Sequence, residues 1–418
     1  MSEAQTLHHH IRRMTGRDPH EAHRVATPLE LLFDLTFATS FSLGAAQFAH
    51  VLAAGHFSAA ILGFGFASFA ICWAWINFSW FSSAYDTDDW IFRIITMVQM
   101  TGVLVLAIGL PRMFASIEHG PHLDNGVMAL GYVIMRVAMV FQWLRAAGQD
   151  PARRRVCLTY VVTIAVAQLG WVALIFLDLS VSWAVFYSVI LALLELTGPY
   201  IAEQKDGGTP WHPHHIAERY SLFAIIALGE GIVGTVATLT AVVDERGWTM
   251  DAALVCIAGT GLTFGMWWVY YMLPSGDILH VHRKRSFIWG YGQIIPIAAI
   301  LATGAGLHVA AYFIEHEAHI TALQTVLCVA VPVGVFLGSV YALYYHLVRQ
   351  FDVLHVWLLS GTVLVVALAI GAAVANVDMA VCLIVLTLAP AVTVVGYEVS
   401  GYRHQFEALA KEDVMLER

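Results

Sequence analysis

The chain has 418 residues, of which 59% are hydrophobic and 12% are charged, whereas an ordinary soluble domain carries about 25% charged residues. This composition excludes a disordered chain, a disulfide scaffold, a coiled coil and an ordinary soluble enzyme. The formal net charge is −9, its acidic residues are scattered over short loops and no long basic run occurs, so we exclude nucleic acid as a partner.

Twelve apolar segments follow one another along the chain. A segment of about 20 apolar residues crosses the hydrocarbon core of a bilayer as a helix. We therefore predict an all-α polytopic membrane protein with about twelve transmembrane helices, whose partner is the lipid bilayer. The predicted spans are 29–50, 58–84, 91–115, 126–146, 156–177, 181–202, 215–242, 252–274, 287–313, 322–347, 353–374 and 377–398.

The distribution of basic residues predicts the orientation of these spans. If the N-terminus is cytoplasmic, seventeen of the 21 lysines and arginines fall on the cytoplasmic side, and only Arg112 and Arg246 fall outside. Cytoplasmic loops carry such an excess. We therefore predict a multi-pass membrane protein with both termini cytoplasmic, namely an N-terminal arm (1–28) and a C-terminal tail (399–418).

Six predicted spans precede a polar linker at 203–214 and six follow it. Two six-helix halves, 29–202 and 215–398, would then enter the membrane in the same direction, which permits a parallel duplication. The second span of each half ends in an aromatic run, WAWINFSWF (73–81) and WWVYY (267–271). The alternative is that these similarities are common to all membrane helices.

Ionisable residues inside spans are costly and are functional candidates by default. The first span carries Glu30 and Asp34, whose i,i+4 spacing puts both carboxylates on one helix face. Such a pair could share a proton or a cation. The alternative is that Glu30 reaches the interface and a neighbouring helix satisfies Asp34.

The loop after the second span has the sequence YDTDDWIFR (85–93) and contains Asp86, Asp88, Asp89 and Arg93. An aspartate at a helix N-terminus complements the helix dipole. We expect these residues to cap the third span, with Arg93 tethering the loop. An antechamber for ions is the alternative.

Arg136 lies near the centre of the fourth span, where an unpaired arginine is not tolerated. We predict that it lies within salt-bridge reach of Asp34, Glu195 or Glu230. Three acids against one base would leave a surplus of negative charge or of proton-binding capacity. The alternative is that the extra acids are simply protonated.

The seventh span, HIAERYSLFAIIALGEGIVG (215–234), carries three ionisable residues, Glu218, Arg219 and Glu230. Gly229 and Gly231 flank Glu230, which suggests either close helix packing or a local unwinding of the helix. His215 and Glu218 are spaced i,i+3, but no HExxH or CxxC motif accompanies them. We therefore predict no metal site, no cofactor and no catalytic residue.

Three stretches resemble the bacterial low temperature requirement protein A family: RVATPLELLFDLTF (24–37), YDTDDWIFR (85–93) and HIAERYSLFAIIALGEGI (215–232). The resemblance implies a polytopic bacterial inner-membrane protein, and it implies little about chemistry. Three residues depart from the expected pattern, namely Gly231, Met272 and Gln293. Residues that stand at family positions are Glu30, Asp34, Arg93, His215, Glu218, Arg219 and Glu230.

These observations favour a secondary transporter with an acidic intramembrane site, one that could be proton-coupled and would act on a small solute or ion. A channel-like pore, a membrane-embedded enzyme acting on lipid, and a non-catalytic assembly or sensor protein are the alternatives. An enzyme is the less favoured of these, and self-association into a homo-oligomer is left open.

Overall fold

A computed structural model describes residues 11–21, 24–177, 179–350 and 352–411. Residues 1–10 of the predicted arm and 412–418 of the predicted tail lie outside the described residues. Asp178, at the split between two predicted spans, also lies outside them.

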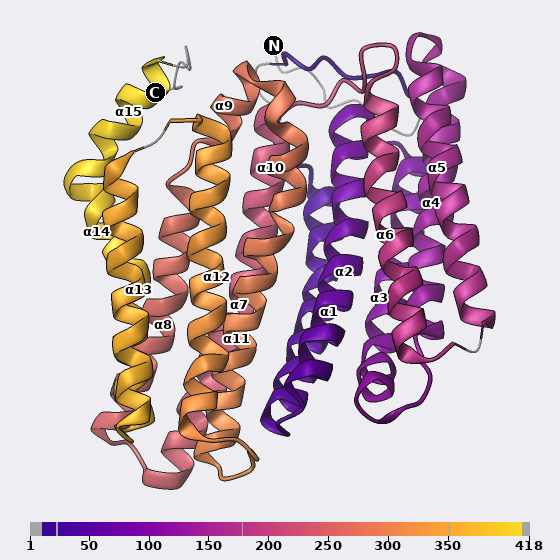
Figure 1. The fold of residues 1–418 in the computed structure, drawn as a ribbon. Coiled ribbons are helices and arrows are strands. Elements are labelled where there is room, and N and C mark those ends of the chain that lie inside the picture. The colour runs from indigo at the N-terminus through magenta and orange to yellow at the C-terminus, as the bar shows by residue number, and fades with distance from the viewer. Residues whose placement is uncertain (1–10, 22–23, 178, 351, 412–418) are drawn as a thin grey trace, which may run out of the picture. The chain divides into compact units, whose positions relative to one another are not determined.

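The described residues are mainly helical, with no β-strand among them. Within this part of the chain, twelve helical segments are long and apolar enough to cross a membrane, which confirms the predicted fold class. Figure 1 shows the helices in chain order: α1 (Pro28–Ala53), α2 (Phe57–Tyr85), α3 (Trp90–His119), α4 (Gly126–Gln149), α5 (Arg154–Phe176), α6 (Val181–Glu203), α7 (Pro213–Arg246), α8 (Met250–Tyr271), α9 (Ser275–Val281), α10 (Ser286–Gly292), α11 (Ile294–Ile314), α12 (Ala322–Val348), α13 (Val353–Val374), α14 (Met379–Gly396) and α15 (Tyr402–Lys411).

Short turns connect several of these helices. Two 3₁₀ turns, Pro151–Arg153 and Arg283–Arg285, precede α5 and α10, and a π turn at Tyr397–Gly401 joins α14 to α15. The predicted tail therefore does not begin as irregular chain, because helical structure continues to Lys411.

The chain divides into two compact units, which we describe separately. The first comprises the residues up to Ser40 together with Ala70–Ile216, and the second comprises Phe41–Phe69 together with Ala217–Arg418. Helices α1, α2 and α7 thus contribute residues to both units. The predicted six-helix halves follow the chain order and not these units, so the duplication stays a prediction.

Close packing of α3 on α4 holds the first unit together. A Cβ atom added at Gly131 would lie 2.2 Å from the backbone nitrogen of Leu106, and one added at Gly109 would lie 2.3 Å from that of Met128. These glycines therefore let two helix backbones approach each other, as small residues do in membrane proteins.

In the second unit, α7 packs on α11 in the same way. A Cβ atom at Gly234 would lie 2.4 Å from the carbonyl oxygen of Gly304, and one at Gly304 would lie 2.6 Å from the carbonyl carbon of Glu230. Helix α7 is continuous through this region. Of the two glycines that flank Glu230, Gly231 is closely packed, since a Cβ atom there would lie 2.5 Å from Thr263 Oγ1, whereas one at Gly229 would meet nothing within 4 Å.

Apolar side chains cover much of the outer surface of the spans. On α13, Val363, Leu364 and Leu368 are each about 60% exposed within this unit, and on α6 Leu193 is 57% exposed. Such surfaces are unfavourable in water and favourable against lipid tails. The protein is therefore a membrane protein with many spans.

Candidate functional site

The N-terminus of α1 is built as a capping box around Glu30. The backbone N–H of Thr27 donates to Glu30 Oε2 at 2.7 Å, and the backbone N–H of Glu30 donates to Thr27 Oγ1 at 3.3 Å. Pro28 occupies the first helical position, where its fixed φ is favourable. The local sequence T-P-L-E therefore fixes the Glu30 carboxylate, which is fully buried, at the start of the span.

Helix α7 begins with the same arrangement of residues. The backbone N–H of His215 donates to His212 Nδ1 at 3.3 Å, and Pro213 is again the first helical residue. His212 Nε2 lies 2.8 Å from the carbonyl oxygen of Glu21, so a neutral ring protonated at Nε2 satisfies both contacts. Burial lowers the pKa of His212, in agreement with a neutral ring.

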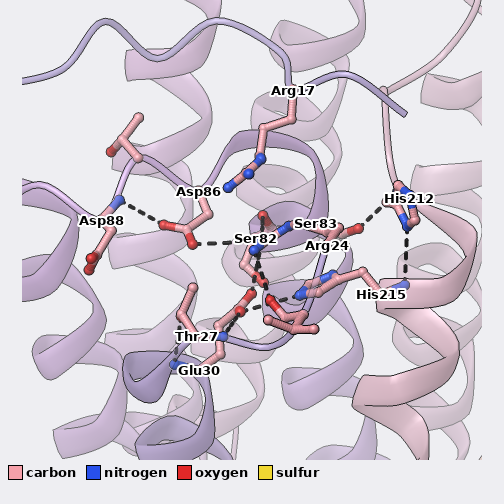
Figure 2. A network of polar contacts seen from close by, with 12 residues as sticks. Arg17, Arg24, Thr27, Glu30, Ser82, Ser83, Asp86, Asp88, His212 and His215 are labelled. Carbon is pink, nitrogen blue, oxygen red and sulfur yellow. Dashed lines mark hydrogen bonds and ion pairs between the residues drawn. The ribbon is translucent and has the colours of Figure 1, made fainter. Parts of the chain in front are cut away.

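The third residues of these two helices meet each other. His215 Nε2 lies 3.2 Å from Glu30 Oε2, and both side chains are fully buried within the first unit. Figure 2 shows this contact together with the His212–His215 hydrogen bond. Two motifs that are about 185 residues apart in the sequence thus form one polar network.

Arg24 connects this pair to the end of α2. Its Nη2 lies 3.5 Å from Glu30 Oε1 and 3.6 Å from Asp86 Oδ2, and it donates to the carbonyl oxygen of Ser82 at 3.3 Å (Figure 2). The Arg24 side chain is 3% exposed and that of Asp86 is 2% exposed. One buried guanidinium therefore faces two buried carboxylates.

This charge balance affects the acid at the end of α2. Burial, and to a lesser extent the nearby Glu30 carboxylate, raise the pKa of Asp86, and Arg24 opposes them, so that the pKa of Asp86 is about 6. Burial also lowers the pKa of Arg24, against the effect of Glu30. Three buried polar atoms here make no hydrogen bond with the described residues, namely Arg24 Nε, Asp86 Oδ2 and Thr87 Oγ1. Buried polar atoms are usually hydrogen-bonded, so these three are exceptions within the network.

We expect Asp86→Asn to change how stability depends on pH. Between about pH 4 and pH 6 the folded protein holds a proton on Asp86 that the unfolded chain has released, so stability falls as pH rises through this range. The resulting loss in the free energy of unfolding approaches about 2–3 kcal/mol above pH 6. The apparent melting temperature of the wild type relative to Asp86→Asn, measured in detergent from pH 4 to pH 7, should therefore fall with pH.

The exposed Asp124→Asn variant is the matched control. Its apparent melting temperature should differ from that of the wild type by the same amount at every pH. If the melting temperatures of the wild type and Asp86→Asn also differ by a constant amount from pH 4 to pH 7, Asp86 does not titrate in this range.

The rest of the 85–93 loop is structural. Asp89 caps α3 by accepting from the backbone N–H of Phe92 at 2.9 Å, and Arg145 binds the same carboxylate through both terminal nitrogens. Although burial raises the pKa of Asp89, these hydrogen bonds hold it below its ordinary value. Arg93 binds Asp88 in a bidentate pair at 2.8 and 2.9 Å. The predicted capping is confirmed for Asp89 alone of the three aspartates, and the predicted tether by Arg93 is made to Asp88.

A second polar centre lies inside the first unit, around Glu195 on α6. Arg136 Nη2 lies 2.5 Å from Glu195 Oε2, which confirms the predicted pairing of the buried arginine. Four other side chains donate to the same carboxylate, from α2, α4 and α5: Trp73 at 2.5 Å, Tyr132 at 2.5 Å, Gln168 at 3.1 Å and Trp171 at 3.0 Å. The acceptor sites of Glu195 are thus occupied by protein donors.

The remaining predicted site residues are divided between the two units. Asp34 is buried in the first unit, where Trp75 Nε1 donates to its Oδ1 at 2.6 Å. Glu230 is 5% exposed in the second unit, and Ser42 Oγ donates to its Oε1. Among the residues that the structure describes, Glu230 has no ion-pair partner. Arg219 is fully buried and Glu218 is half-buried, both in the second unit.

Comparison with known proteins decides the family. The bacterial low temperature requirement A (LtrA) proteins match residues 25–390 of the chain. The chain belongs to the LtrA family. It is 23% identical over 294 residues to an uncharacterised protein of Rhizobium meliloti (strain 1021), which covers 66% of this chain and 67% of that protein. No solved structure matches the chain.

Several residues of this LtrA site were missed by sequence reasoning. Thr27 could have been found, because a capping threonine followed by proline marks a helix start. The role of His212 could not, since histidine is not one of the usual capping residues. Trp73 and Trp75 lie in an aromatic run whose indole N–H groups bind Glu195 and Asp34, but a run of tryptophans alone does not indicate which acids they meet. Arg24 is one of many basic residues outside the predicted spans, and nothing in the sequence distinguishes it from the exposed ones, so its burial could not be predicted.

Proposed function

We propose that this LtrA-family protein is a proton-coupled secondary transporter of a small solute or ion in the bacterial inner membrane, with both termini cytoplasmic. The observation that carries the proposal is the buried network at the ends of α1, α2 and α7. In it, Asp86 has a pKa of about 6 and shares one arginine with Glu30. A group with such a pKa exchanges protons near the working pH of a cell.

The intramembrane acids Glu195 and Glu230 support the proposal to different degrees. Glu195 is saturated by five donors, so we assign it a structural role. Glu230 has a serine as its neighbour and no counter-ion among the described residues, so it is the better candidate for a coupling acid. Buried acids of this kind mark proton relays in pumps and transporters. In this account Asp86 in the first unit and Glu230 in the second bind and release the proton.

Uptake into proteoliposomes tests the proposal. Vesicles with an imposed inward proton gradient are incubated with a mixture of amino acids, organic cations, sugars and metal ions, and the trapped solutes are quantified by mass spectrometry. A transporter accumulates at least one solute only while the gradient lasts. Entry that stops at equal concentrations and ignores the gradient would indicate a pore, and chemical conversion of added lipid would indicate an enzyme.

A further inference from the structure

An aromatic groove lies beside the end of α8 in the second unit, and it shares no residue with the network described above. Phe264, Trp267, Trp268 and Tyr271 follow the spacing i, i+3, i+4, i+7, so they share one face of the helix. Phe264 and Trp267 stack with ring centroids 5.4 Å apart, and Trp267 lies 5.4 Å from Tyr271. The rings therefore form a continuous aromatic wall.

The opposite side of the groove comes from the π turn after α14. A π turn adds a residue to one helical turn, so side chains four and five positions apart lie near one face, and such turns are frequent at functional sites. Tyr397, Glu398 and Tyr402 line the groove from this segment. Trp268 Nε1 lies 3.3 Å from Glu398 Oε1, which places the carboxylate against the aromatic wall.

The groove is large and accessible. Its volume is about 670 Å³, within the range of small-molecule sites. Trp267 and Tyr271 are each 37% exposed, and Tyr402 is 61% exposed. Among the described residues that line it, Glu398 carries the one formal charge.

We propose that this groove binds an alkylammonium group, such as that of choline, whether free or in a lipid headgroup. The faces of tryptophan and tyrosine rings attract organic cations, and a carboxylate beside them adds an opposite charge. Glu398 would repel an anionic ligand, and a strongly hydrated inorganic ion would gain little from aromatic faces. An aromatic belt at the membrane interface explains tryptophan and tyrosine, but it needs no carboxylate among the rings. The proposal does not rest on the transport function.

Calorimetric titration of the purified protein with tetramethylammonium chloride, against sodium chloride at equal ionic strength, tests the proposal. The wild type should show saturable binding. Glu398→Gln and Trp267→Leu should each weaken binding by about tenfold, in line with the strength of a desolvated cation–π contact. Glu407→Gln, an exposed acid on α15 outside the groove, should bind as the wild type does.

A second arm identifies the source of the ammonium group. In nanodiscs of phosphatidylglycerol, free choline should bind if the ligand is soluble. If the ligand is a headgroup, native mass spectrometry should show phosphatidylcholine retained by the wild type and lost from Glu398→Gln. Trp267→Phe keeps an aromatic ring and should bind better than Trp267→Leu, which separates binding from a folding defect. Equal, unsaturable binding to the wild type and Glu398→Gln would overturn the proposal.

Discussion

Replacing Arg136 by methionine is expected to destabilise the protein by about 3–5 kcal/mol, because it leaves the Glu195 carboxylate buried without its counter-ion. Arg136 and Glu195 are each 3% exposed, so water cannot replace the lost charge. The four neutral donors around Glu195 would still bind it, but they carry no positive charge. The apparent melting temperature in detergent should fall by several degrees, and less folded protein should be recovered from membranes.

The double variant Arg136→Met/Glu195→Gln shows whether charge is the cause. Since glutamine is neutral and keeps an acceptor oxygen, it should recover most of the lost stability. Arg112→Met, at an exposed arginine on α3, is the matched control and should change stability by less than about 0.5 kcal/mol. The explanation by charge is wrong if Arg136→Met has the same melting temperature as the wild type. It is also wrong if adding Glu195→Gln to Arg136→Met does not restore the lost stability.

Replacing Glu230 by glutamine is expected to remove the pH dependence of transport while the protein stays folded. Glutamine has the shape of glutamate and keeps an oxygen that accepts from Ser42, so the close packing of α7 on α11 is preserved. What it loses is the ability to bind and release a proton, which a coupling acid requires. Initial uptake rates between pH 5.5 and pH 8 should vary in the wild type and stay constant in the variant.

The control for this experiment lies on the same helix. Glu245 is exposed near the end of α7, and Glu245→Gln should keep the wild-type pH profile. If Glu230→Gln retains that profile, Glu230 is a structural acid, and the proton must be carried elsewhere.

Much of the fold follows from hydropathy alone, because a span needs only length and apolar side chains. The twelve predicted spans therefore correspond to twelve helical segments of the described residues, although their ends differ by several residues. Asp89 was correctly predicted as a cap because capping is a local interaction between a side chain and the first turn of its own helix. The continuation of the chain as α15 was not predicted, since polar residues after residue 398 ended the hydropathy signal.

The candidate site was predictable as a set of residues but not as an arrangement. Three acids were considered as partners for Arg136, and the choice of Glu195 depends on helix packing that no single sequence specifies. The Glu30–His215 contact likewise joins two helix starts that are far apart in the chain. Glu30 was grouped with Asp34 by their spacing, yet Glu30 binds His215 and Arg24, whereas Asp34 accepts from Trp75.

Proton movement driven by the solute is the most direct test of proton-coupled transport. Proteoliposomes containing a pH-sensitive dye, with no initial pH gradient, receive the solute identified by the uptake experiment on one side. The account predicts that the internal pH changes on addition of the solute to the wild type, and that the change is absent in a variant carrying both Asp86→Asn and Glu230→Gln. Solute entry at the wild-type rate with no change of internal pH would contradict it.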